Sequence, residues 1–322
     1  MSFHEDHNAI TLHDCFNTSF LLLAKYTAHL QKTASNARAK TTLDTAPPRI
    51  WFPISYEAYT NVAEDELKKK EVYKALSRSY LPSIESPVSL ASESDIVRAS
   101  ALWFLHPVMK AMQVIVPGAS CSAEVVEPGV RCDVLVTVNG QNIAVLEYKN
   151  RGYVSKNEFM QACVPEYGER NAAQIVDRLT KGFTTDKTEW KTHLTGSSII
   201  LSKQAAAYAT RFGTKYVALF DWDSLFLWYF AAMQITAIRQ ASHGLWAYGS
   251  WVEKRDRFRM ALLGFFLRAY RERKARGSQY GNPSRDPWRP SQQEMNQRRQ
   301  DYEVQQRQKI GSKNVDAYSR RW

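Results

Sequence analysis

Cysteine is scarce in this chain and shows no paired spacing. Only four of the 322 residues are cysteines, namely Cys15, Cys121, Cys132 and Cys163. Zinc ribbons and disulfide-stapled scaffolds need closely or regularly spaced pairs such as C-x-x-C, and the sequence contains none. We therefore expect neither scaffold, and we expect a reducing, intracellular environment, either the nucleus or the cytoplasm.

A long hydrophobic run is also missing. Residues 1–16 are polar overall, and the apolar run Leu225–Met233 follows directly after Asp221 and Asp223. A membrane-spanning helix needs about 20 apolar residues, more than this run supplies. The sequence thus predicts neither a secretion signal nor a membrane anchor.

Acidic residues are outnumbered by basic ones. The chain has 43 Lys+Arg and 32 Asp+Glu, a net charge of +11. This surplus predicts a polyanionic partner, most commonly nucleic acid, although a merely soluble basic surface stays an alternative. From Arg271 onward, thirteen Lys or Arg stand against six Asp or Glu and aliphatic residues become rare. We expect residues 277–322 to form a basic, disordered tail.

The rest of the chain, with 44% hydrophobic residues overall, can fill a globular core. Apolar periodicity, capping residues and turn residues together predict its elements. The expected helices are Thr11–Gln31, a charged helix at Ala63–Ser79, Ser92–Met112, Ser197–Phe212 and Trp251–Arg276, the last with an exposed basic face. The expected strands are Cys121–Val126, Val130–Val138, Ile143–Lys149, Lys215–Phe220 and Leu225–Phe230. This order indicates an α/β protein, with residues 1–90 as a helical region packed on a domain formed by residues 91–276.

Three polar residues interrupt two of these apolar strands. Asp133 lies on one strand, and Glu147 and Lys149 lie on the next, beyond an Asn-Gly turn signal. Side chains alternate between the faces of a strand, so Glu147 and Lys149 share a face. A two-residue loop would place Asp133 opposite Leu146, whereas a three-residue loop at residues 139–141 places it opposite Glu147. We predict the three-residue loop.

Two adjacent carboxylates repel each other unless a cation lies between them. Their hard oxygen atoms suit Mg²⁺ or Mn²⁺, and the Lys149 ammonium could orient or deprotonate a water and stabilise an anionic transition state. This chemistry suits a phosphodiester substrate.

Together these residues resemble the PD-(D/E)XK nuclease superfamily, particularly the nuclease-like domains of fungal proteins. Asp133 matches the aspartate of the second strand, with cysteine before it in place of proline, and Glu147-Tyr148-Lys149 matches the (D/E)-x-K of the third. Gln204 and Tyr208, four residues apart on a predicted helix, are similar to the Gln-x-x-x-Tyr motif of RecB-like exonucleases. The resemblance covers residues 92–230.

The resemblance implies a restriction-endonuclease-like core of order α-β-β-β-α-β, with a mixed central sheet flanked by helices. It implies a metal held by Asp133, Glu147, the carbonyl group of Tyr148 and Glu93, and a catalytic set formed by Asp133, Glu147, Lys149, Gln204 and Tyr208. The implied activity is hydrolysis of nucleic acid, which we expect to be DNA, with Mg²⁺ or Mn²⁺.

Each of these assignments has a simpler alternative. Glu-x-Lys also occurs at 66–68 and 189–191, in charged contexts without a neighbouring aspartate strand. Asp133 and Glu147 could be solvated strand-end charges, Tyr208 a core residue, and Glu93 a carboxylate favoured by the helix dipole. For the whole protein, the alternative is a catalytically inactive nuclease fold that binds nucleic acid or a partner. DNA against RNA, endonuclease against exonuclease and the oligomeric state stay open.

Overall fold

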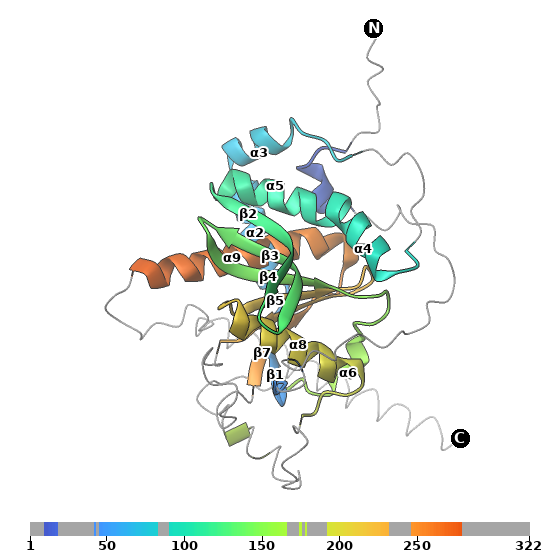
Figure 1. Cartoon of the computed structure of the whole chain (residues 1–322). Coiled ribbons are helices and arrows are strands. Elements are labelled where there is room, and N and C mark those ends of the chain that lie inside the picture. Colours follow the sequence, from blue (N-terminus) through green and yellow to red (C-terminus); the bar gives the residue numbers. More distant parts are fainter. Residues whose placement is uncertain are drawn as a thin grey trace, which may run out of the picture. The chain divides into compact units, whose positions relative to one another are not determined.

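A computed structural model describes residues 10–18, 42, 45–82, 90–165, 174–175, 178, 192–231 and 246–278 (Figure 1). The chain divides into two compact units, residues 1–273 and 274–322. The described residues end at Ser278. Residues 279–322, which are nearly all of the tail predicted at 277–322, therefore lie outside them. So do residues 19–31 of the predicted N-terminal helix, and its described part contains only the short helix η1 (Asp14–Asn17).

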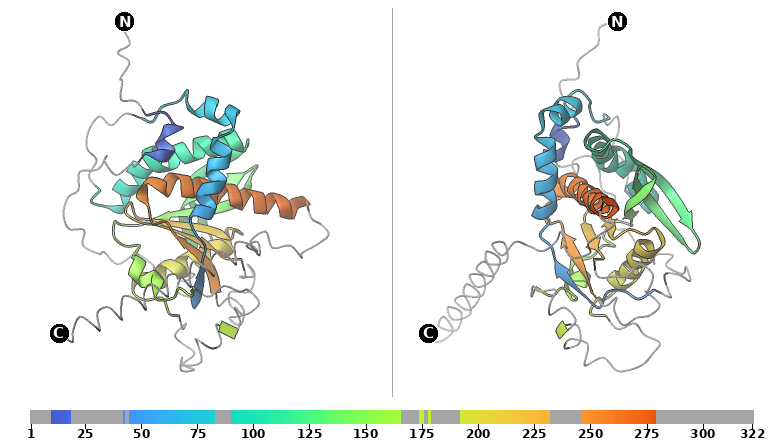
Figure 2. Two further views of the ribbon diagram at one scale, coloured as in Figure 1. Left: turned by 180° about the vertical axis from the view of Figure 1, so that it is seen from behind. Right: turned by 90° about the vertical axis from the view of Figure 1, so that its left-hand side faces the viewer.

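A seven-stranded mixed sheet forms the centre of the first unit (Figures 1 and 2). Its strands are β1 (Ile50–Pro53), β2 (Ala119–Glu127), β3 (Val130–Val138), β4 (Gln141–Tyr148), β5 (Tyr216–Phe220), β6 (Leu225–Tyr229) and β7 (Trp246–Trp251), arranged in the order β1-β7-β6-β5-β4-β3-β2. β4 and β5 pair in parallel, as do β1 and β7, and the other neighbours are antiparallel. The predicted α/β class and mixed sheet are confirmed.

The remaining elements are helical. They are α2 (Glu57–Leu67), α3 (Lys70–Leu76), α4 (Glu93–Ser100), the π-helical turn η3 (Ala101–Leu105), α5 (His106–Ile115), α6 (Lys156–Met160), α8 (Ser197–Arg211), the short η4 (Arg255–Arg257) and α9 (Phe258–Ser278). The expected order of helix, three strands, helix and strand is observed as α5, β2, β3, β4, α8 and β5. No helix in the described part of the chain is long and apolar enough to cross a membrane.

Helices cover both faces of the sheet (Figure 2). On one face, Val217 and Leu219 of β5 belong to a core cluster that also contains the alanines of α8. On the other face, the ring of Phe220 stacks on Phe104 of η3 with ring centroids 4.1 Å apart, and Tyr216 contacts Phe265 of α9. Because consecutive residues of β5 face opposite helical layers, this strand is apolar throughout instead of alternating.

The C-terminal helix differs from its prediction. Trp251 ends strand β7, and α9 begins only at Phe258. Residues 258–267 are all buried, Arg259 among them, so the expected basic face is absent from this part of the helix. At Gly264, an added Cβ would lie 1.8 Å from the carbonyl oxygen of Tyr59 in α2. α9 is therefore a central core helix, packed between α2 and the sheet.

A buried arginine joins the N-terminal segment to this core. The Arg259 guanidinium donates to the carbonyl oxygens of Trp103, Cys15 and Thr18, at 2.6, 2.7 and 3.0 Å. Trp103 lies in the π-helical turn η3, and Pro107 of the following helix has no N–H to donate to that turn. Arg259 supplies that donor instead.

Candidate active site

The β3–β4 turn is shorter than predicted. Val138 pairs with Gln141, so the loop contains two residues, Asn139 and Gly140. Their φ angles are 49° and 75°, which a tight two-residue hairpin turn requires. The prediction of a three-residue loop is wrong, because Asn-Gly makes the shorter turn by itself.

An extra residue in β4 offsets this difference. Asn142 pairs with Thr137 and Ala144 pairs with Val136, which leaves Ile143 without a partner on β3. This arrangement is a β-bulge, in which two residues of one strand oppose one residue of the other. It shifts every later pair by one residue, as a longer loop would have done.

The C-terminal end of α8 holds the bulge in place. The side-chain amide of Asn142 donates to the carbonyl oxygen of Phe212 at 2.9 Å. The hydroxyl group of Thr214 donates to the carbonyl oxygen of Ile143, and that hydroxyl also accepts the N–H of Tyr216 at 3.2 Å. The loop between α8 and β5 therefore supports the site's register.

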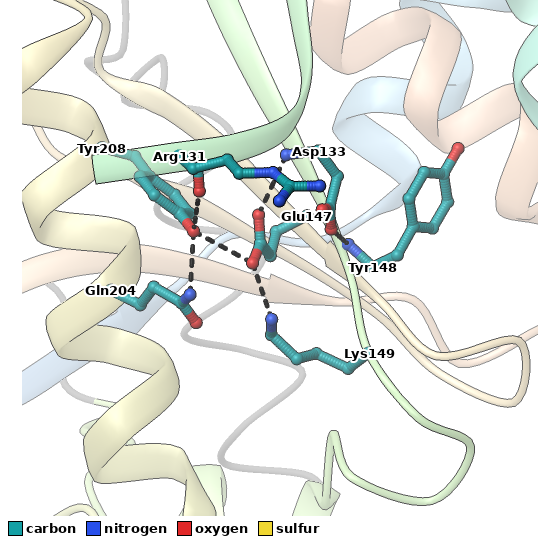
Figure 3. Close-up of polar contacts among 7 residues, drawn as sticks. All are labelled: Arg131, Asp133, Glu147, Tyr148, Lys149, Gln204 and Tyr208. Atoms are coloured by element: carbon teal, nitrogen blue, oxygen red, sulfur yellow. Dashed lines mark hydrogen bonds and ion pairs between the residues drawn. The ribbon is translucent and has the colours of Figure 1, made fainter. Parts of the chain in front are cut away.

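Asp133 consequently lies beside Glu147, in the predicted register. The N–H of Asp133 donates to Oε2 of Glu147 at 3.3 Å, and the N–H of Tyr148 donates to Oδ2 of Asp133 at 2.7 Å (Figure 3). Burial and the neighbouring charge of Glu147 raise the pKa of Asp133 to about 7. Negative charge is thus poorly compensated here.

Glu147 and Lys149 form a buried ion pair on the same face of β4. Nζ of Lys149 lies 2.6 Å from Oε1 of Glu147, and the two residues are only 4% and 3% exposed. Burial lowers the pKa of Lys149, but the charges of Glu147 and Glu93 outweigh it, so the net shift is upward. The lysine is therefore held as an ammonium ion. Tyr148 points away from this group, as strand alternation predicts (Figure 3).

The helix α8 brings Tyr208 and Gln204 to the same carboxylate. The Tyr208 hydroxyl lies 3.0 Å from Oε1 of Glu147 and 2.8 Å from the carbonyl oxygen of Arg131. Gln204 donates from Nε2 to that hydroxyl at 2.8 Å, while its buried Oε1 has no hydrogen-bond partner among the described residues. Burial and then the charge of Glu147 raise the pKa of Tyr208, which keeps it a proton donor.

Glu93 approaches the group from the first turn of α4. The helix begins with the predicted capping box, in which Ser92 and Asp95 each accept the other's N–H. The Glu93 carboxylate accepts the N–H of Asn150, directly after Lys149. Burial raises its pKa, with the charge of Lys149 opposing and that of Asp133 adding to this shift. Glu93 thus belongs to the same electrostatic group.

Three carboxyl groups and one ammonium therefore share this site. The available donors for a hard cation are the carboxylates of Asp133, Glu147 and Glu93. As the side chains are placed, no three His, Cys, Asp or Glu residues within the described ranges are grouped closely enough to hold a metal ion. Oε1 of Glu147 is turned instead toward Lys149 and Tyr208.

A second polar cluster, at the C-terminal ends of β4 and β5, was not predicted from the sequence. Asp221 and Asp223 lie in the β5–β6 turn. Asp223, however, also pairs with Arg151 and Arg255. These partners are 72 residues before it and 32 after it, and only the parallel pairing of β4 with β5 could have suggested the contact with Arg151.

Comparison with known proteins gives no relative. No family model matches this chain, and neither a curated protein nor a solved structure matches it.

Proposed function

We propose that this protein is a metal-dependent nuclease with a PD-(D/E)XK-type core. The observation that carries the proposal is the convergence of Asp133, Glu147 and Lys149 with Tyr208 and Gln204 around one carboxylate. Further support comes from the parallel pairing of β5 with β4 and from the order of the elements.

The donor set suits Mg²⁺ or Mn²⁺. Asp133 and Glu147, with Glu93 and the carbonyl group of Tyr148, would offer the hard oxygen ligands that these ions prefer. Burial and then the charge of Glu147 raise the pKa of Asp133, and a divalent cation would offset both effects. When bound, such an ion polarises the phosphoryl group and lowers the pKa of a coordinated water.

The chain's own residues would orient and neutralise the reactants. Lys149, held as an ammonium ion beside Glu147, would stabilise the negative charge that develops on the phosphoryl oxygens. Tyr208 fixes the orientation of the Glu147 carboxylate, and Gln204 fixes that of Tyr208. The net charge of +11 favours nucleic acid as the substrate, and we propose DNA.

Cleavage of labelled single-stranded and duplex DNA tests this proposal. The wild type, with Mg²⁺ or Mn²⁺ but not with EDTA, should cleave at least one substrate, whereas Glu147→Gln and Lys149→Met should not. Glu272→Gln is a matched control, because Glu272 is also buried and lies 3.4 Å from Lys215 beside the start of β5. Equal cleavage by the wild type and both site variants would indicate a contaminant and end the assignment.

A non-catalytic module that binds nucleic acid is the second candidate. The observation that favours it is the Glu147–Lys149 pair, which satisfies its own charges without a metal. This alternative predicts salt-dependent DNA binding without cleavage. It also predicts that Mg²⁺ and Mn²⁺ leave the melting temperature unchanged, whereas the nuclease should melt at a higher temperature with either ion.

A further inference from the structure

The end of β4 that carries the candidate site also gathers basic residues. β4 and β5 run in parallel, and the N–H of Lys149 donates to the carbonyl oxygen of Phe220 at 2.9 Å, so the two strands end side by side. β7 ends at the same end of the sheet, because its last residue Trp251 pairs with Phe226 at the start of β6. The loops that leave these three strands are therefore neighbours.

Two arginines from these loops meet on one aspartate. Arg151, two residues after Lys149, binds Asp223 through Nε and through Nη2, the latter at 3.1 Å. Arg255, from η4 after β7, places its Nη2 3.2 Å from Oδ1 of the same carboxylate. Two guanidinium groups thus share one carboxylate, that of Asp223.

The cluster is anchored in the backbone and still reaches solvent. Asp221, fully buried, accepts the N–H groups of Val154, Asp223 and Ser224, and so ties the Arg151 loop to the β5–β6 turn. The Arg255 side chain is 41% exposed. A fixed, partly exposed guanidinium pair is well suited to bind a phosphate group.

We propose that Arg151 and Arg255, preoriented by Asp223, bind a backbone phosphate of nucleic acid beside the phosphodiester at the Asp133–Glu147 site. This inference rests on the proposed function for its substrate class. Arg151 follows Lys149 by two residues, in the turn directly after β4. The candidate metal site and the arginine pair would together fix the strand's position.

Binding to labelled DNA in EDTA tests the inference apart from any cleavage. Arg255→Gln should weaken binding roughly fivefold and reduce the slope of log K against log salt by about one. Asp223→Asn should strengthen binding, because the amide oxygen of Asn can still accept from the guanidinium groups and orient them, while the charge that offsets them is removed. Arg271→Gln is a matched control, since the Arg271 side chain is 50% exposed and pairs with the Glu66 carboxylate at 2.7 Å.

The direction of these changes decides the outcome. Unchanged binding by Arg255→Gln, or equal weakening by Asp223→Asn and Arg255→Gln, would assign the cluster a packing role and overturn the inference. Weakened binding by Arg255→Gln together with undiminished cleavage by Glu147→Gln would keep the phosphate site and remove the nuclease assignment. If Glu147→Gln lost cleavage while Arg255→Gln bound DNA normally, the nuclease assignment would stand and the phosphate site would be ruled out.

Discussion

The hydroxyl oxygen of Tyr208 lies 3.0 Å from Oε1 of Glu147, although 61 residues separate the two in the sequence. This contact ties the helix α8 to the carboxylate on β4. A conservative substitution can remove it without emptying the space that the ring fills.

Tyr208→Phe should lower the cleavage rate by at least tenfold and the free energy of unfolding by only about 1 kcal/mol. The reason is that the lost hydroxyl orients Glu147. Tyr216→Phe is a matched control, because the buried Tyr216 donates to Glu272 at 2.7 Å. The control should lose similar stability and keep its activity, as measured by urea unfolding and DNA cleavage. Equal loss of activity in both variants would contradict a specific role for Tyr208.

Lys149→Met should destabilise the protein by about 3 kcal/mol, because it leaves Glu147 buried without its cation. The double variant Glu147→Gln with Lys149→Met should recover most of that loss. Urea unfolding of the wild type, both single variants and the double variant measures the coupling. Additive losses would show that the two charges do not stabilise each other.

Asp133→Asn should stabilise the metal-free protein at high pH. The pKa of Asp133 is raised from 3.8 to about 7 in the folded chain, so folding favours its protonated form and its contribution to stability falls as pH rises between these values. In EDTA, the variant should therefore melt several degrees above the wild type at pH 8 and closer to it at pH 5. Asp221, whose pKa is also raised to about 7, is common to both proteins and cancels. If the difference in melting temperature between the two proteins were the same at pH 5 and pH 8, the raised pKa of Asp133 would be contradicted.

Thr214→Val should lower the free energy of unfolding by about 1 to 2 kcal/mol, because it leaves the Ile143 carbonyl at the bulge without its donor. Thr210→Val is the control, since the Thr210 hydroxyl donates to the carbonyl oxygen of Ala206 within its own helix. The control should lose less, as measured by urea unfolding. A larger loss in the control would mean that the bulge does not depend on Thr214.

The register of the site could be predicted from the sequence, but the position of the extra residue could not. Fourteen positions separate Asp133 from Glu147. With a two-residue turn, this spacing places them opposite each other only when one further residue between them is unpaired. The spacing does not say whether that residue lies in the loop or in the strand. Asn-Gly kept the loop short, and the contacts from Phe212 and Thr214, distant in sequence, placed the extra residue at Ile143.

Residues that meet through tertiary packing were harder to predict. The basic residues of α9 suggested an exposed face. Periodicity alone does not reveal that α2 packs on this helix or that backbone carbonyl oxygens accept hydrogen bonds from Arg259. The ion pairs of Asp223 with Arg151 and Arg255 form because β4, β5 and β7 end at the same end of the sheet. By contrast, Tyr208 and Gln204 could be placed because helical spacing is local.

Arg259 also limits where this chain can be shortened. Its guanidinium donates to the carbonyl oxygens of Cys15 and Thr18, more than 240 positions earlier. A chain that starts after Thr18 would retain the buried guanidinium but lose those acceptors, at a cost of several kcal/mol. A fragment cut to the sheet and its nearest helices would thus be less stable than the whole chain, and it would also lack the fully buried side chains of Cys15 and Phe16.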